Sequence, residues 1–146
     1  MPLPAPEPGL VVHYGFVWAG PGRVRAADAG KDRPCLIVDV ARTLEPNLAG
    51  RAVTRVVYLP ISHLGPGPGE TAIPIPPRVA AHLELSGPTW WLYTSYANED
   101  DWPFDLARRL GAEERFDDGF VPPRLVEQVA ADFAAFVKRG GRALRR

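Results

Sequence analysis

Proline and glycine interrupt this chain along most of its length. The 146 residues include 17 prolines and 14 glycines. Proline lacks a backbone N–H and fixes φ, so it is poorly tolerated inside helices and in the central strands of sheets. The chain is therefore expected to form short elements joined by many turns, and a long helical bundle is disfavoured. Its length suits one domain that buries roughly two-thirds of its unfolded surface.

Hydrophobic patterning predicts five strands and three helices. The strands are expected at residues 10–18, 34–40, 52–59, 71–75 and 88–94. The helices are expected at residues 77–83, 104–110 and 123–139, and Gly140 is expected to end the last one. Loops or turns are expected at residues 19–32, 43–50, 60–70 and 98–103.

The order of these elements indicates the fold class. Strands that follow one another without long helices between them favour an antiparallel sheet over a parallel α/β sheet. The chain is therefore predicted to be mainly β, as a β-barrel with added helices or a curled sheet, with the last helix over one opening or edge. One domain is expected over residues 1–146, comprising a flexible proline-rich arm (1–9), a barrel core (10–103), a C-terminal helix (123–139) and a basic tail (140–146).

Charge is balanced overall but unevenly placed. The formal net charge is zero, so the chain has no global positive field to hold nucleic acid. Residues 138–146 nevertheless carry only basic charges, and residues 99–118 are mostly acidic. A local basic groove therefore remains compatible with this composition.

The cysteine content and the hydropathy of the chain indicate in which cellular compartment the protein is expected. Cys35 is the single cysteine, so no intrachain disulfide is possible, which fits a reducing cytoplasm. It lies in an apolar run and is interpreted as a buried strand residue. Residues 1–8 lack the basic start and apolar stretch of a signal peptide. No apolar run approaches the roughly 18 residues of a membrane helix, so a cytoplasmic protein without a membrane partner is expected.

Familiar catalytic and cofactor motifs are missing from the sequence. Gly20-Pro21-Gly22 is not followed by the Gly-Lys-Ser/Thr of a phosphate-binding loop, and no Gly-x-Ser-x-Gly elbow is present. The three histidines, His13, His63 and His82, are far apart and form no metal-binding pattern. Neither a metal nor a cofactor is expected.

Three segments carry a resemblance when their order and spacing are considered together. They are Gly-Leu-Val-Val at 9–12, Gly-Lys-Asp-Arg-Pro-Cys-Leu-Ile-Val at 30–38, and Val-Val-Tyr-Leu-Pro-Ile-Ser-His at 56–63. Together they resemble the PemK/MazF family of growth-inhibitor toxins. Residues 90–98 and Trp102-Pro103 are similar to a divergent plasmid-maintenance branch of that family, so the resemblance spans about 9–103.

The resemblance implies a fold and an activity. Members have an SH3-like barrel and usually form homodimers. They are endoribonucleases, hydrolases that cleave single-stranded RNA such as mRNA without a metal, through attack of the RNA's own 2′-OH. They act as toxins of type II toxin–antitoxin systems, in which a cognate antitoxin protein blocks the RNA-binding groove.

The resemblance also implies site residues. The family's catalytic arginine corresponds to Arg33, and its catalytic threonine or serine to Ser62. Arginine can bind a phosphate with two parallel hydrogen bonds, and a hydroxyl can hold the phosphate or the attacking oxygen. The acid often found before Arg-Pro has no certain match, so Asp28, Asp32 or the neighbouring His63 is expected to assist proton transfer.

Further residues are expected to bind RNA around this site. Arg23, Arg25 and Lys31 can supply positive charge from the loop. Bases can stack on aromatic rings, for which Tyr14, Trp18 and Tyr96 are the expected platforms.

Other interpretations stay open at this point. Arg33 can be an ordinary surface or ion-pair arginine, and Ser62 a turn serine. SH3-like barrels host many functions, so a non-catalytic module that binds a protein partner or nucleic acid is the alternative. A third interpretation is an adaptor that oligomerises through its last helix.

Overall fold

The computed structural model describes residues 3–18, 31–44, 52–103, 106–107 and 117–146. Two helices lie in this part of the chain, α1 (Pro77–His82) and α2 (Pro123–Lys138). The strands described there are β1 (Leu10–Phe16), β2 (Lys31–Leu44), β3 (Ala52–Ser62), β4 (Ala72–Pro74), β5 (Trp91–Tyr93), β6 (Asn98–Asp101), β7 (Leu106–Ala107), β8 (Asp117–Phe120) and β9 (Leu144–Arg145).

The strands form one curled sheet in the order β4-β5-β3-β2-β1-β7. β8 also pairs with β1, and β6 pairs with β3 on the side away from β2. These pairs are antiparallel, whereas β9 runs parallel to β6. The prediction of a mainly β chain with an antiparallel, curled sheet and a C-terminal helix is thereby confirmed.

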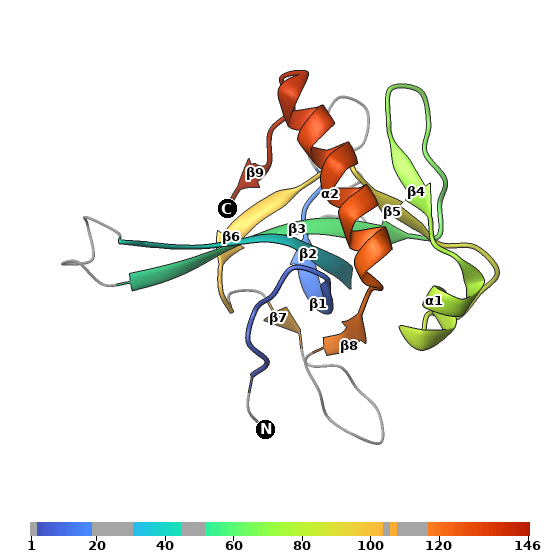
Figure 1. Cartoon of the computed structure of the whole chain (residues 1–146), viewed down its shortest axis with the longest axis horizontal. Coiled ribbons are helices and arrows are strands. Elements are labelled where there is room, and N and C mark those ends of the chain that lie inside the picture. Colours follow the sequence, from blue (N-terminus) through green and yellow to red (C-terminus); the bar gives the residue numbers. More distant parts are fainter. Residues whose placement is uncertain (1–2, 19–30, 45–51, 104–105, 108–116) are drawn as a thin grey trace.

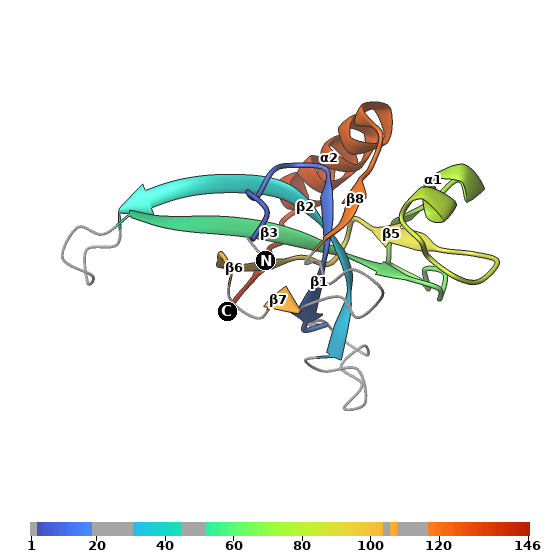
Figure 2. The ribbon, with the colours of Figure 1, turned by 90° about the horizontal axis from the view of Figure 1, so that it is seen from below.

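The longest ladder joins β2 and β3, from Cys35–Pro60 to Leu44–Ala52. Its register shifts between Ile37 and Asp39, so Val38 is the extra residue of a β-bulge. A bulge bends the strand and increases its local twist. Figure 2 shows these two long strands curving together across the molecule.

Two hydrophobic clusters lie on opposite faces of the curled sheet. The helix-side core includes Leu36, Leu59, Ile61, Leu92, Leu125 and Val129. The aromatic core includes Tyr14, Phe16, Trp18, Cys35, Tyr58 and Tyr93. Because strand side chains alternate between faces, neighbouring residues of β1, β2 and β3 enter different cores. β1 is consequently buried along almost its whole length.

Helix α2 crosses the helix-side core (Figure 1). Pro123 starts the helix, where a missing N–H costs nothing, and Leu125 and Val129 face the sheet. The structure confirms the predicted helix at 123–139 to within one residue, and α1 confirms the helix predicted at 77–83.

Several strand boundaries differ from the prediction. β2 begins at Lys31 and continues to Leu44, and β3 runs on through Pro60 to Ser62. Pro60 thus lies in the last pair of the β2–β3 ladder, and Pro34 lies one residue beyond it, opposite His13 of β1, where β2 has no β3 partner. The strand expected at 88–94 is shorter, because only Trp91–Tyr93 pair with neighbours.

The acidic region after residue 97 was predicted incorrectly. Asn98–Asp101 form strand β6 instead of a loop, because backbone pairing with β3 outweighs the low strand propensity of acidic residues. Leu106–Ala107 form β7 against β1, so the helix expected at 104–110 is wrong over these two residues. The rest of that segment lies outside the described residues.

The residue before β1 and the C-terminal tail are both attached to the sheet. Gly9, at the end of the expected arm, donates its N–H to the Ile37 carbonyl and accepts from Val121. Leu144–Arg145 of the basic tail pair with β6. Within the described residues, no helix has both the length and the apolar character needed to cross a membrane.

We predict that Val129→Ala lowers the free energy of unfolding by about 2 kcal/mol, because it removes buried methyl groups and leaves a cavity. The matched control is Val137→Ala on the same helix, since Val137 is 47% exposed and Val129 is fully buried. That control is expected to change stability by less than about 0.5 kcal/mol. Urea denaturation followed by circular dichroism measures both; equal effects would contradict this docking of α2.

Candidate functional site

The β2–β3 ladder ends at Cys35–Pro60, and there the two strands separate. β2 continues along β1, whereas β3 turns to pair with β5. One residue further along β2 is Pro34, which has no N–H to donate to β3, so the ladder cannot continue in the same way. We call this place the fork; its arms are residues 33–35 of β2 and 60–62 of β3 (Figures 1 and 2).

Arg33 and Ser62 occupy matching positions on the two arms of the fork. Each lies two residues beyond the last ladder pair, Cys35–Pro60. Since side chains two residues apart share a face, both follow Cys35 onto the side of the aromatic core. The guanidinium carbon of Arg33 lies 5.2 Å from the centroid of the Trp18 ring, in cation–π contact.

Ser62 is the last residue of β3 and is 5% exposed. Its Oγ accepts a hydrogen bond from the Leu64 N–H at 3.2 Å, and the Tyr93 hydroxyl donates to the Leu64 carbonyl at 2.6 Å. The Tyr93 ring meets Trp18 edge-on, with 5.2 Å between centroids. A continuous set of contacts therefore links Arg33, through Trp18 and Tyr93, to the turn that holds Ser62.

His63 does not join Arg33 and Ser62. Its ring packs edge-on against Trp90, with 5.8 Å between centroids. Trp90 packs against the helix-side core, whereas the ring beside Arg33, Trp18, belongs to the aromatic core. The alternation of side chains after Ser62 explains this separation. The structure therefore places His63, one of the residues expected to assist proton transfer, apart from Arg33.

The acids and cations expected around Arg33 are only partly described. Asp32 is exposed and lies opposite Gly15 of β1. Lys31 begins β2, opposite Phe16. The remaining expected residues, Asp28, Arg23 and Arg25, lie outside the described residues.

Two of the expected stacking platforms are core residues. Tyr14 is fully buried and its ring stacks on Tyr58 with 3.9 Å between centroids. Trp18 is 4% exposed and packs edge-on against Phe16 and Tyr96. These two rings therefore show no free face for a base in this structure, and the stacking role expected of Tyr14 and Trp18 stays a prediction. Tyr96 is only partly buried.

A buried polar cluster that the sequence did not predict lies under the aromatic core. The Tyr14 hydroxyl donates to Asp100 Oδ2 at 2.8 Å and accepts from Arg146 Nη1 at 3.0 Å. Arg146 also donates to the Gly15 carbonyl, and its Nη1 lies 4.0 Å from Asp100 Oδ2. Asp100 is 3% exposed, so the guanidinium offsets the cost of burying its carboxylate. In the sequence, the only sign of this cluster was the opposite charge of segments 99–118 and 138–146. No local pattern shows which acid pairs with which base.

The aromatic core strongly favours neutral phenols. Burial raises the pKa of Tyr14 well above its ordinary value, and the hydrogen bond to Asp100 raises it further, while Arg146 partly opposes the rise. Burial likewise raises the pKa of Tyr58, with smaller contributions from Cys35 and Asp100. The Tyr58 hydroxyl is buried, and no hydrogen-bond partner for it is found in the described part of the chain.

Metal ligation has no obvious location in the described ranges. Among those residues, no three His, Cys, Asp or Glu side chains gather closely enough to hold an ion. Two of the histidines lie in different parts of the fold: His63 packs against Trp90, and His82 is the last residue of α1.

Comparison of the chain with models of protein families, with curated proteins and with solved structures found no match in any of the three. The site is therefore described by its own geometry.

Two conservative substitutions test the polar cluster. Tyr14→Phe is expected to destabilise the fold by about 2 kcal/mol, because Asp100 loses a donor in a buried place. Tyr58→Phe is expected to be neutral or slightly stabilising, since it removes a buried hydroxyl without a partner among the described residues. Chemical denaturation at pH 7 measures both. A larger loss for Tyr58→Phe than for Tyr14→Phe would contradict the hydrogen-bond assignment.

The raised phenol pKa values also predict a pH dependence. Above pH of about 10, tyrosines of the unfolded chain lose their protons while Tyr14 and Tyr58 keep theirs in the fold. The unfolded state then binds fewer protons than the native state, so the free energy of unfolding falls as pH rises. We expect Tyr58→Phe to show a shallower fall between pH 10 and 11.5 than wild type. Identical slopes would show that Tyr58 is not protected from ionisation.

Proposed function

We propose that this chain is an endoribonuclease that cleaves single-stranded RNA without a metal ion, built on an SH3-like barrel of the PemK/MazF toxin type. The observation that carries the proposal is the fork. Arg33 and Ser62, the two residues matched to the family's catalytic pair, are both two residues past the last β2–β3 pair and follow the same face. Fixed backbone partners on β1 and β5 hold them in place.

The chemistry is an in-line transfer at phosphorus. The 2′-oxygen of the RNA forms a bond to the adjacent phosphorus while the bond from phosphorus to the 5′-oxygen breaks, which leaves a cyclic phosphate and a 5′-OH. Arg33 stabilises the negative charge that develops on the phosphate oxygens. Ser62 Oγ accepts from the Leu64 N–H, and its own O–H serves as the donor to a phosphate oxygen.

Proton transfer completes the reaction. One proton leaves the 2′-OH and another is delivered to the departing 5′-oxygen. Asp32 adjoins Arg33 in β2, but the alternation of strand side chains turns it to the other face. No described carboxylate is therefore assigned to this step, and Asp28, the other acid expected from the sequence, lies outside the described residues. His63 is not assigned, because its ring packs against Trp90 on the other face.

In the cell this activity corresponds to the toxin of a type II toxin–antitoxin system, with mRNA as its substrate in the cytoplasm. The same family resemblance supports a homodimer and inhibition by a cognate antitoxin that covers the RNA-binding groove. Phe120 and Val137 are both 47% exposed and provide apolar surface for such partners.

A second function is favoured by one specific observation. Ser62 is only 5% exposed. The rings of Trp18 and Tyr93, which connect Arg33 to the turn after Ser62, pack against each other. A site so closely packed suits a non-catalytic module that binds RNA or a protein partner through the rim of the fork.

Cleavage of RNA in the presence of EDTA tests the proposal. We expect wild type to cut single-stranded RNA into fragments with a 5′-OH, and to leave RNA with a 2′-deoxy nucleotide at the cut site intact there. Arg33→Ala is expected to slow cleavage by about 10²- to 10³-fold, because a donor to the transition state is lost. Ser62→Ala is expected to slow it as well, to a smaller extent.

The matched control is Arg42→Ala, an exposed arginine on the same strand, β2. It lies nine residues from Arg33 in sequence, roughly 30 Å along an extended strand, and is expected to cleave like wild type. Equal rates for Arg33→Ala and wild type would contradict the nuclease. RNA binding by wild type without cleavage would favour the binding module.

A further inference from the structure

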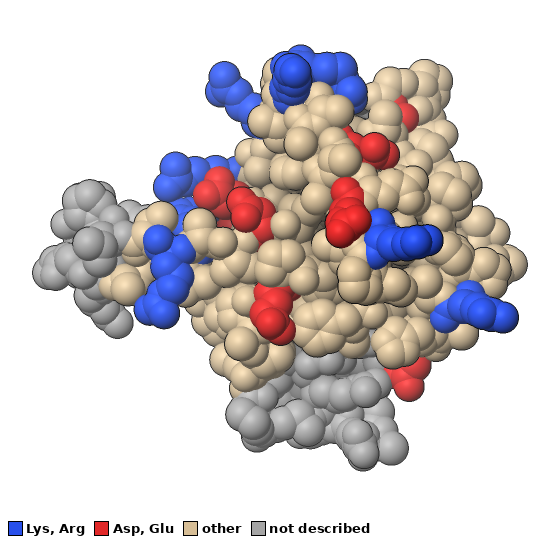
Figure 3. Space-filling view, viewed as in Figure 1, with Lys and Arg blue, Asp and Glu red and all other residues tan. Residues whose placement is uncertain are grey.

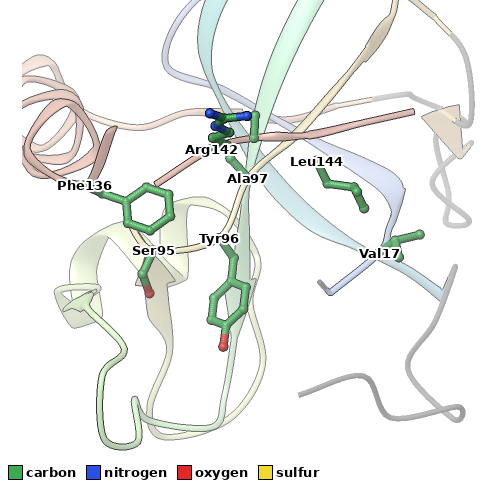
Figure 4. Close-up of a pocket in the computed structure, with 8 residues that line it drawn as sticks. Val17, Ser95, Tyr96, Ala97, Phe136, Arg142 and Leu144 are labelled. Carbon is green, nitrogen blue, oxygen red and sulfur yellow. The ribbon is translucent and has the colours of Figure 1, made fainter. Parts of the chain in front are cut away.

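A pocket of about 240 Å³ opens between the end of α2, the tail and residues 95–97, which precede β6. Figure 4 shows the rings of Phe136 and Tyr96 on one side of it, Val17 and Leu144 on the other, and Arg142 at its rim. Drug-sized ligands usually occupy about 300–1,000 Å³. The pocket therefore has room for one flat ring system.

Tyr96 is held in position from two directions. Its hydroxyl donates to Glu70 Oε2 at 2.5 Å, and its ring meets Trp18 edge-on with 4.9 Å between centroids. The other oxygen of Glu70, Oε1, accepts from the Gly67 N–H at 2.7 Å, so the carboxylate itself is held in place. The Tyr96 ring is a fixed wall of the pocket.

Phe136 is positioned by the turn that ends α2. Gly140 adopts φ of +98°, and the Gly141 N–H donates to the Phe136 carbonyl at 2.9 Å. The Gly140 N–H donates to Val137, which completes a Schellman motif. A Cβ on Gly141 would lie 2.4 Å from the Phe136 ring, so a larger residue there would require the ring to move. The second aromatic wall is therefore also preorganised.

The tail forms the remaining wall and is anchored beyond it. The Leu144 N–H donates to the Ala97 carbonyl at 2.7 Å, and β9 pairs with β6. Two residues further on, Arg146 enters the buried cluster of Tyr14 and Asp100. The pocket thus exists only while the tail is docked.

The mouth of the pocket is basic. Arg142 lines it, and Lys138, Arg139 and Arg145 are exposed neighbours in a segment that contains no acid. Figure 3 shows Lys and Arg side chains gathered where α2 ends. Aromatic walls with a cationic rim are the combination by which proteins bind single-stranded nucleic acid, where bases stack and phosphates meet positive charge.

We propose that this pocket binds one nucleobase of single-stranded RNA against Tyr96 and Phe136, with the adjacent phosphate on Arg142. The proposal rests on the proposed function for the identity of the ligand as RNA. Tyr96 contacts Trp18, and Trp18 lies under the guanidinium of Arg33, so ring contacts connect the pocket to the fork. A strand bound in this pocket is thereby guided to the fork.

Binding of a fluorescein-labelled hexanucleotide of 2′-O-methyl RNA, which has no 2′-OH and cannot be cleaved, tests the pocket by anisotropy. Arg142→Gln is expected to weaken binding about 3- to 10-fold and to reduce the slope of log affinity against log salt by about 0.7, as for one lost phosphate contact. The matched control is Arg124→Gln, an exposed arginine at the opposite end of α2, which is expected to bind like wild type.

Substitutions of Tyr96 test the base contact. Tyr96→Leu removes the ring and is expected to weaken binding about tenfold or more, whereas Tyr96→Phe keeps the ring and is expected to stay within about threefold of wild type. An abasic oligonucleotide of the same length and charge is expected to bind wild type at least tenfold more weakly than the RNA. Thermal melting of each variant confirms that it is folded.

The outcomes separate this inference from the proposed function. If Arg142→Gln and Tyr96→Leu, both folded, bind like wild type, the pocket assignment is overturned even when wild-type protein cleaves RNA. If hexaglutamate displaces the RNA as well as unlabelled RNA does, charge alone holds the ligand and the base pocket is overturned. Loss of binding in both variants by a protein that never cleaves RNA retains the pocket and rejects only the nuclease.

Discussion

The backbone ladder between β2 and β3 is the interaction on which the rest of this structure depends. It fixes the register of the two longest strands, and the bulge at Val38 bends them so that one sheet can separate two cores. The position at which this ladder ends also matters, because it determines where the two strands separate. Beyond Cys35–Pro60 the strands take different partners, and the fork that results places Arg33 and Ser62 on separate arms with a shared face.

The alternation of side chains then sorts the candidate residues. Arg33 lies with Trp18 on the side of the aromatic core, while His63, the neighbour of Ser62, packs with Trp90 against the helix-side core. A one-residue step along a strand reverses the face, so residues adjacent in a motif are separated in space. Ser62 and Arg33, 29 positions apart in the chain, are in contrast linked by ring and backbone contacts.

The tail couples the aromatic core to the surface. Arg146 compensates the buried carboxylate of Asp100 through Tyr14, and this anchor holds β9 on β6. Leu144 and Arg142, in the same segment, line the pocket beside Tyr96. A partly buried charge pair therefore supports a pocket on the surface, and the basic segment is part of the fold as well as a source of positive charge.

The sequence alone determined the β-rich class, the edge strand at 71–75 and helix α2, because apolar periodicity and proline and glycine positions are local properties. It could not determine β6, β7 or β9, since their polar or very short segments become strands only when β3, β1 and β6 supply backbone partners. Of the candidate site, the resemblance of the motifs singled out Arg33 and Ser62 as expectations, whereas burial showed that Tyr14 and Trp18 are core rings. The Arg146–Tyr14–Asp100 cluster required the tertiary structure for the same reason: its members are distant in sequence and meet only once the sheet has curled.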